Sequence, residues 1–155
     1  MSVSIELHSA LGFSAVLPDG SFLLADSSGG PQSEQISIPG DILFSMVRDD
    51  DTVHDYAQTI EWTEKFASFY TFTYHGVIQM AGSIASEGKQ SYAVAVDFTD
   101  QNGNQRIATV VGMKFGTGEF FGLTLLDPVT EPGQQPDAQW VKQIVDGISV
   151  NAAAA

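Results

Sequence analysis

The chain has 155 residues, of which 43% are hydrophobic and 10% aromatic, and it contains no cysteine. A chain of this length and composition is expected to fold around its own hydrophobic core, which excludes a disordered protein. The absence of cysteine excludes disulfides, thiol catalysis and zinc–thiolate sites. Nineteen acidic and six basic residues give a formal net charge of −13. This charge disfavours nucleic acid and anionic lipid as partners and favours basic partners or cations.

Short strands separated by turns are predicted in the first third of the chain. Partial alternation of apolar and polar residues indicates strands at residues 4–7, 12–17, 21–25, 35–38 and 42–47. Turns are marked at residues 18–20 and 39–40, each with a proline and a glycine. Residues 26–31 contain two serines and two glycines and predict a flexible internal loop.

A long helix is predicted at residues 52–69. Three aspartates at residues 49–51 and Thr52 come first, and acidic and capping side chains favour the positive end of a helix. Apolar residues then recur with helical spacing along one face. A second apolar stripe is formed by Trp62, Phe66 and Phe69. The helix is therefore expected to pack on a sheet.

The part of the chain after residue 70 alternates with a period of two and predicts an antiparallel meander. The expected strands span residues 72–75, 77–85, 91–98, 106–115 and 119–126. Asn102 and Gly103 predict a tight type I′ hairpin turn between two of these strands, because that turn needs positive φ at both central positions.

The C-terminal part predicts a second helix. A proline-containing loop at residues 128–136 precedes Asp137, which is expected to cap a helix at residues 138–146, and a short strand follows at residues 148–150. Residues 1–150 are expected to form a single domain and residues 151–155 a disordered tail. The predicted fold class is α+β, with an antiparallel β-sheet meander packed against two helices.

No catalytic, metal-binding or nucleotide-binding motif is present. His8, His54 and His75 lack metal-ligand spacing, and the chain has neither a glycine-rich phosphate loop nor a nucleophile elbow. We therefore expect no catalytic residue, no metal, no cofactor and no enzymatic activity. A hydrolase whose carboxylates meet only in space stays open as an alternative. The acids considered for it are Glu6, Asp41, Asp97 and Glu119.

The most hydrophobic segments are residues 107–111 and 120–126. Two interpretations fit them: a central strand covered on both faces, or an exposed groove that binds an apolar segment of a partner. The second interpretation gives a candidate binding surface made of Trp62, Val111, Phe120, Phe121, Leu123 and Leu125.

The order of the predicted elements and two segments resemble the PsbP-like α/β family. The segments are residues 12–18 (GFSAVLP) and 140–150 (WVKQIVDGISV), and residues 92–98 and 106–111 match the central hairpin. This family includes the photosystem extrinsic protein, a Ran-binding nuclear import factor, bacterial lipoproteins of the DcrB and LpqN kind, and adaptor chaperones for type VI secretion effectors. The resemblance implies a PsbP-like α/β sandwich and a non-enzymatic binding or assembly role, and no site residue carries over.

The function expected from these observations is a protein-binding or adaptor/chaperone module that acts through an apolar sheet groove. Its partner would be a protein with an apolar or basic segment, and a homodimer is also compatible. The alternative is a small-ligand or carbohydrate-binding domain that uses Trp62, Tyr70, Tyr74 and Tyr92 as stacking surfaces. No membrane span or signal peptide is visible, so a cytoplasmic protein is expected, although a mature secreted domain would show the same pattern.

Overall fold

The computed structural model describes residues 4–24 and 33–151. Within these residues the chain forms ten strands and two helices: β1 (Ser4–His8), β2 (Phe13–Pro18), β3 (Phe22–Leu23), β4 (Ser33–Ile38), β5 (Ile42–Arg48), α1 (Tyr56–Thr73), β6 (Val77–Ser86), β7 (Lys89–Thr99), β8 (Gln105–Phe115), β9 (Phe120–Pro128), α2 (Ala138–Asp146) and β10 (Ile148–Val150). No helix among them combines the length and the hydrophobicity needed to span a membrane.

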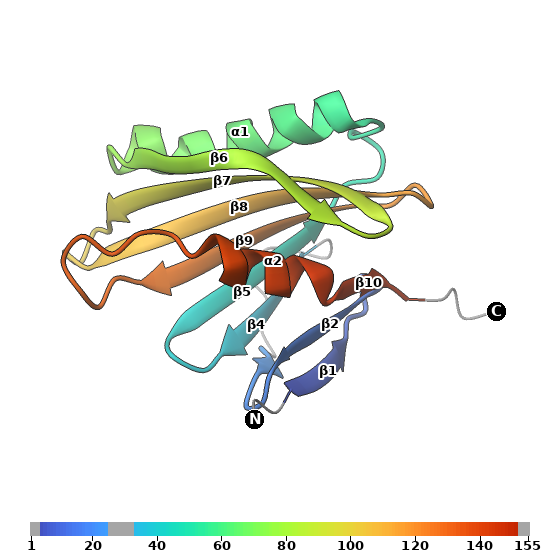
Figure 1. Cartoon of the computed structure of the whole chain (residues 1–155), viewed down its shortest axis with the longest axis horizontal. Helices are drawn as coiled ribbons and strands as arrows, with labels where there is room; N and C mark the ends of the chain where they lie inside the picture. Colours follow the sequence, from blue (N-terminus) through green and yellow to red (C-terminus); the bar gives the residue numbers. More distant parts are fainter. Residues whose placement is uncertain (1–3, 25–32, 152–155) are drawn as a thin grey trace.

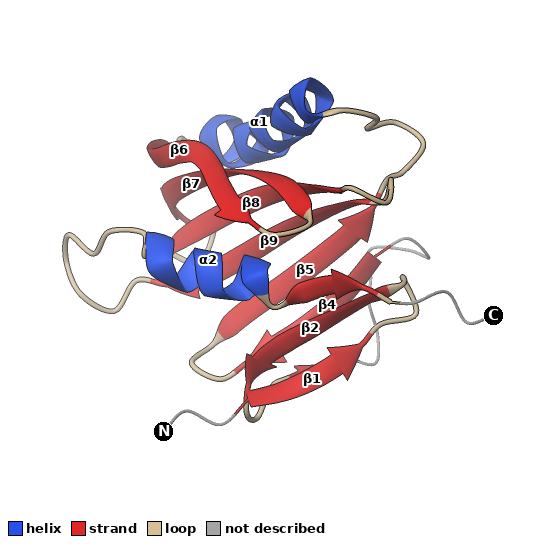
Figure 2. Ribbon diagram, turned by 45° about the vertical axis from the view of Figure 1, so that its right-hand side comes forward, coloured by secondary structure: helices blue, strands red, loops and turns tan. Residues whose placement is uncertain are grey.

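Seven strands form the middle layer, an antiparallel sheet in the order β3-β4-β5-β9-β8-β7-β6. On one face α1 lies over β7 and β8. On the other face lie α2 and a second, three-stranded sheet in the order β1-β2-β10 (Figures 1 and 2). The predicted α+β class, with an antiparallel meander and two helices, is confirmed.

The core between the two sheets is built around Phe13 of β2. Its ring centroid lies 6.1 Å from that of Phe44 and 5.6 Å from that of Phe121, and all three side chains are fully buried. Ile144 and Val145 of α2 join the same cluster. Burial of each such side chain stabilises the fold by about 1.5–3 kcal/mol, so this layer attaches the small sheet and α2 to the large sheet.

A pair of glycines determines how closely α1 approaches the sheet. Gly112 of β8 and Gly122 of β9 lie opposite each other in the strand register. A Cβ atom at Gly122 would lie 1.9 Å from Trp62 Cη2, and one at Gly112 would lie 2.4 Å from Thr63 Oγ1. The helix side chains therefore occupy the space that any larger strand residue would need.

The start of α1 differs from the prediction. The helix begins at Tyr56 and not at residue 52, because its N-cap is Asp55, whose carboxylate accepts a hydrogen bond from the backbone of Gln58 at 2.8 Å. The acidic run before it does not cap the helix, since the carboxylate of Asp50 binds elsewhere in the chain, as described below.

The strand predicted at residues 72–75 is wrong, because α1 continues to Thr73. Tyr70 and Tyr74 are one helical turn apart, and the ring centroid of each lies 5.0 Å from that of Phe98 in β7. This packing favours the helical spacing of the two tyrosines. The sequence pattern alone also fitted an extended segment.

The hairpin between β7 and β8 lies where it was predicted but has a different turn. Of its two central residues only Gly103 has positive φ, 83°, so the turn is not type I′. The backbone N–H of Asp100 donates to the carbonyl of Asn104, which closes a three-residue loop. The Asp100 carboxylate accepts from the backbone N–H groups of Asn102 and Asn104, and these bonds stabilise the longer loop.

The C-terminal prediction is largely confirmed. α2 and β10 have the predicted bounds, and the carboxylate of Asp137 accepts hydrogen bonds from the backbone of Gln139 and Trp140 at 3.1 Å each. Asn151 does not belong to a free tail, because its backbone N–H donates to the carbonyl of Gly12 at 2.8 Å. The loop predicted at residues 26–31, residue 25 and the tail residues 152–155 lie outside the described residues.

We predict that Gly122→Ala destabilises the protein by about 2–3 kcal/mol, because the new methyl group overlaps the Trp62 ring and the helix or the ring must move. Urea unfolding followed by circular dichroism measures this loss. The control is Gly82→Ala in β6, where a Cβ atom meets no atom within 4 Å. That variant should stay within about 1 kcal/mol of the wild type. Equal effects of the two substitutions would contradict the assigned role of Gly122.

Candidate functional site

The six residues predicted to bind a partner lie in the interior. Trp62 of α1 is 8% exposed, and the five on β8 and β9 have no exposed surface; these are Val111, Phe120, Phe121, Leu123 and Leu125. β9 is the central strand of the large sheet, so its side chains alternate between the layer next to α1 and the layer next to the small sheet. For the five strand residues the structure therefore corresponds to the interpretation of a covered central strand, and these five do not form a groove open to a partner.

A groove open to solvent lies beside α1. The helix packs on β7 and β8, and the same face of β4, β5 and the end of β9 is only partly covered. We call this hollow of about 290 Å³ the α1 groove. Its helix side consists of Trp62, Phe66 and Tyr70, with the first two rings stacked at 4.1 Å. Its sheet side consists of Gln35, Leu43, Ser45, Val47, Gly122, Thr124 and Leu126.

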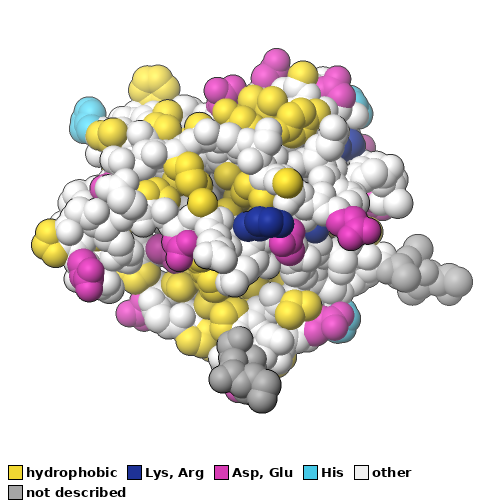
Figure 3. Space-filling view, viewed as in Figure 1, with side chains coloured by type: hydrophobic (Ala, Val, Ile, Leu, Met, Phe, Trp, Pro, Cys, Tyr) yellow, Lys and Arg dark blue, Asp and Glu magenta, His cyan; other side chains and the backbone are white. Residues whose placement is uncertain are grey.

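Exposed phenylalanines extend this apolar surface along α1. Phe66, Phe69 and Phe72, which we call the phenylalanine stripe, are 43%, 53% and 81% exposed. Val77 and Ile78 at the start of β6 are exposed as well. In Figure 3 hydrophobic side chains form a cluster over α1 at the top of the molecule. Large apolar side chains gathered on the surface of a folded domain usually mark a binding surface.

Charged residues border the groove where α1 begins. A hollow of about 300 Å³ shares Trp62 and Phe66 with the groove and is also lined by Asp49, Glu61 and Lys65. Two acids and one base give this border a net negative charge, which has the same sign as the net charge of the whole chain, −13. A negative surface next to an apolar one favours a partner that carries basic residues.

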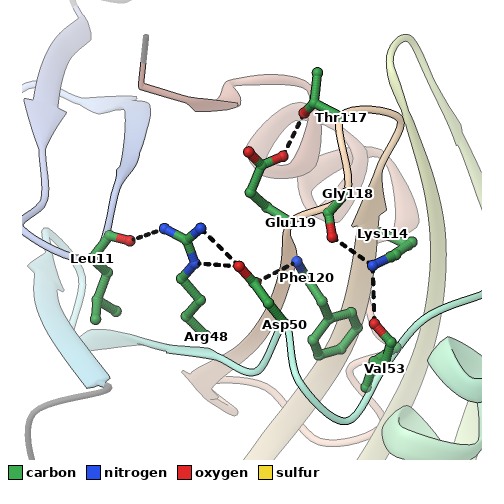
Figure 4. A network of polar contacts seen from close by, with 9 residues as sticks. All are labelled: Leu11, Arg48, Asp50, Val53, Lys114, Thr117, Gly118, Glu119 and Phe120. Atoms are coloured by element: carbon green, nitrogen blue, oxygen red, sulfur yellow. Dashed lines mark hydrogen bonds and ion pairs between the residues drawn. The ribbon is translucent and has the colours of Figure 1, made fainter. Parts of the chain in front are cut away.

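A network of polar contacts connects the end of β5 to the β8–β9 hairpin (Figure 4). Arg48 donates to Asp50 at 3.0 and 2.8 Å and to the carbonyl of Leu11 at 2.8 Å. Burial raises the pKa of Asp50, but hydrogen bonds from Arg48 and from the backbone of Phe120 outweigh it and hold this pKa below its ordinary value. Lys114 beside them donates to two backbone carbonyls. Because these charges are matched within the protein, the network is structural.

A larger cleft opens at the opposite ends of β5 and β9. It has a volume of about 480 Å³ and lies between the β4–β5 turn, the end of β9, the proline-containing loop and the start of α2. We call it the Asp127 cleft. Asp127 and Asp137 contribute its carboxylates, and Ile42, Ile107 and Trp140 are among its apolar walls. Among the described residues no lysine, arginine or histidine lines it.

Asp127 is the most perturbed carboxyl group of the described residues. Burial, and then the negative charge of Asp137, raise the pKa of Asp127 to about 6. No sequence motif marks this residue, although the alternation of β9 contains a signal for it. Asp127 continues the odd-numbered series of Leu123 and Leu125, whose side chains face the buried layer between the sheets.

The carboxylates considered for a hydrolase are not gathered at one point. Glu6 lies in β1, Asp41 in the β4–β5 turn, Asp97 in β7 and Glu119 in the β8–β9 turn. Across residues 4–24 and 33–151 no group of three or more histidine, aspartate or glutamate side chains is placed to hold a metal ion.

These layers define the fold class as a PsbP-like α+β sandwich, and comparison with solved structures confirms it. The chain is similar to the solution structure of cyanobacterial PsbP (CyanoP) from Synechocystis sp. PCC 6803, with a TM-score of 0.56 over 97% of this chain and 94% of that one. The two sequences are 9% identical, so the likeness concerns the fold alone. No protein-family model and no curated protein sequence matches the chain.

We predict that Asp127→Asn stabilises the protein at pH 7.5 and has little effect near pH 4. The folded-state pKa of about 6 lies above the unfolded value of 3.8, so the unfolded chain ionises first and stability is lost as the pH rises between these values. The gain should be about 1 kcal/mol, less than the pKa difference implies, because water still reaches part of the carboxyl group.

Urea unfolding of both proteins at pH 4.0 and 7.5 measures this difference. Comparing the two proteins at each pH cancels the contributions of the other carboxyl groups. A variant that is less stable than the wild type at pH 7.5 would show that the Asp127 carboxylate makes a favourable contact in the folded state.

Proposed function

We propose that this chain is a non-enzymatic protein-binding module of the adaptor or chaperone kind, and that it binds an apolar segment of its partner on the α1 surface. The observation that supports this proposal is the combination of the α1 groove with the phenylalanine stripe. Both include side chains of α1, and the face of the sheet beside this helix is partly uncovered. The proposal keeps a groove beside the sheet, and of the six residues predicted to bind the partner it retains Trp62 alone.

The partner is a segment with apolar side chains and basic neighbours. The apolar side chains fit the groove between Phe66 and the β5 residues Leu43 and Val47. Basic neighbours fit the acidic border formed by Asp49 and Glu61. The net charge of −13 also disfavours a second copy of this chain as the partner, because like charges on two copies repel each other.

The magnitudes require the partner to fill the groove as well as cover the stripe. Full burial of a phenylalanine contributes about 1.5–3 kcal/mol, and the side chains of the stripe are partly buried already, so together they offer roughly 3–5 kcal/mol. Association itself costs about 4–15 kcal/mol. The stripe alone therefore does not hold a partner, and side chains inserted beside Trp62 and Phe66 supply the remaining free energy.

The alternative function, binding of a small ligand or carbohydrate, is supported by the presence of the Asp127 cleft. The aromatic rings predicted to stack on such a ligand do not line that cleft. Tyr70 and Tyr74 pack against Phe98, and Trp62 packs against Gly122 and Phe66. Tyr92 is partly buried against the cluster under α1, so these four rings do not form a common stacking platform for a sugar.

We predict that Phe66→Glu abolishes partner binding while the protein stays folded. A pull-down from lysate of the source organism, with quantitative mass spectrometry, compares this variant with the wild type and with Val16→Glu. Val16 of β2 has the same exposed fraction as Phe66, 43%, and lies in the small sheet on the other side of the molecule. Loss of even one apolar contact of about 1.4 kcal/mol raises the dissociation constant about tenfold, and the charge buried against the apolar partner weakens binding further.

The expected result is one stoichiometric protein retained by the wild type and by Val16→Glu, and lost with Phe66→Glu. Phe121 and Leu123 are unsuitable for this test, because a charge at these buried positions would unfold the protein. Retention of the same proteins by all three baits would refute the assignment to the α1 surface. Size-exclusion chromatography with light scattering tests separately whether the partner is a second copy.

A further inference from the structure

The Asp127 cleft combines two acidic groups with no basic one. Within residues 4–24 and 33–151, Asp127 and Asp137 are the only titratable side chains that line it. Arg106 of β8 is next to a lining residue in sequence, but strand alternation places it on the other face of the sheet, where it pairs with Asp100 at 2.8 Å. A cation inside the cleft would therefore meet negative charge that the protein does not neutralise.

The two carboxylates differ in what already binds them. Asp137 accepts hydrogen bonds from the first backbone N–H groups of α2. Across residues 4–24 and 33–151 no hydrogen-bond donor and no basic side chain contacts the carboxylate of Asp127. Burial and the charge of Asp137 act against its ionisation and raise its pKa to about 6. An ammonium group next to Asp127 would relieve both effects, since it supplies an opposite charge and a donor.

The walls of the cleft suit an organic cation better than a metal ion. Ile42, Ile107 and Val141 give it apolar sides, and Trp140 adds an indole ring that can stack on an apolar group or lie against a cation. The Nε1 atom of Trp140 is buried and has no hydrogen-bond partner among the described residues. Calcium takes six to eight oxygen ligands and is usually held by several carboxylates. Besides its two carboxylates the cleft offers only neutral side-chain oxygens, those of Thr109, Thr130, Gln134 and Gln135, and among the described residues no three acidic or histidine side chains are placed to hold a metal ion. A volume of about 480 Å³ is in the range of small-molecule sites.

We propose that the Asp127 cleft binds a small organic amine, with its ammonium group at Asp127 and its apolar part against Trp140 and Ile107. This site is separate from the α1 groove, which lies on the other face of the large sheet. The proposal is independent of the protein-binding function, and each can fail without the other.

The test uses tyramine as the probe, an aromatic amine with a hydroxyl group, in titrations of the full chain followed by two-dimensional NMR at pH 7.5. The neutral analogue 4-ethylphenol, which lacks the ammonium group, is titrated in parallel. Saturable shifts of the backbone signals that line the cleft are expected with tyramine, with at least about tenfold weaker binding of 4-ethylphenol because the charge-assisted bond is missing. Equal binding of the two compounds, or no saturable shift with tyramine, would overturn the proposal.

Two variants locate the interaction. Asp127→Asn keeps the shape of the side chain and should lower the affinity for tyramine about tenfold, while Glu64→Gln on α1 changes the net charge equally and should have no effect. Thermal melting confirms that both variants are folded. If the two variants bind tyramine equally well, the cation is attracted only by the overall charge and the proposed site is wrong.

Titration with pH and with calcium gives the last two outcomes. Tyramine binding to the wild type should weaken between pH 7.5 and 4.5, as Asp127 takes up its proton, and this dependence should disappear in Asp127→Asn. Calcium chloride should not displace tyramine from the cleft. Displacement by calcium at the same signals would identify a metal site and overturn the assignment to an amine.

Discussion

The close contact between α1 and the glycine pair of β8 and β9 is the constraint on which the rest of the structure depends. Gly112 and Gly122 lie side by side in the sheet, and the side chains of Thr63 and Trp62 fill the space above them. This contact fixes both the height of the helix and its position over the strands. Because α1 is held over β7 and β8, it leaves the face of β4 and β5 partly uncovered. The position of the α1 groove thus follows from the two glycines, because their lack of side chains lets α1 lie close to the sheet at this point.

β9 explains why hydrophobicity alone pointed to side chains that the fold buries. As the central strand it is covered on both faces, with Phe121 in the layer between the sheets and Phe120 in the layer under α1. The accessible apolar surface lies at the margin of the layer under α1, where the helix no longer covers the sheet. The Asp127 cleft lies at the margin of the layer between the two sheets, where the apolar series of β9 ends and Asp127 takes the next position facing that layer. Both candidate sites occur where a core layer ends.

The sequence predicted those elements whose signals are local. α2 was predicted with its observed bounds, because its N-cap Asp137 binds backbone groups within three residues of itself. The start of α1 was missed because Asp50, which has the same side chain, is bound by a backbone group seventy residues away in the sequence, at Phe120. The end of α1 was missed because Tyr74 fits both a helix and a strand until Phe98 packs against it. Periodicity shows which residues share a face of an element but not what covers that face, so neither the groove nor the cleft was predictable.

The Arg48 network has a mechanical consequence for the sandwich. Through its bond to the carbonyl of Leu11, Arg48 connects the small sheet to the end of β5, and through Asp50 it connects that end to the β8–β9 hairpin. Leu11 precedes β2, whereas Pro18 at the other end of the same strand lines the Asp127 cleft. The small sheet is therefore attached to the large sheet at both ends of β2, by the Arg48 contacts near Leu11 and by the chain itself after Pro18, which leads directly into β3 of the large sheet.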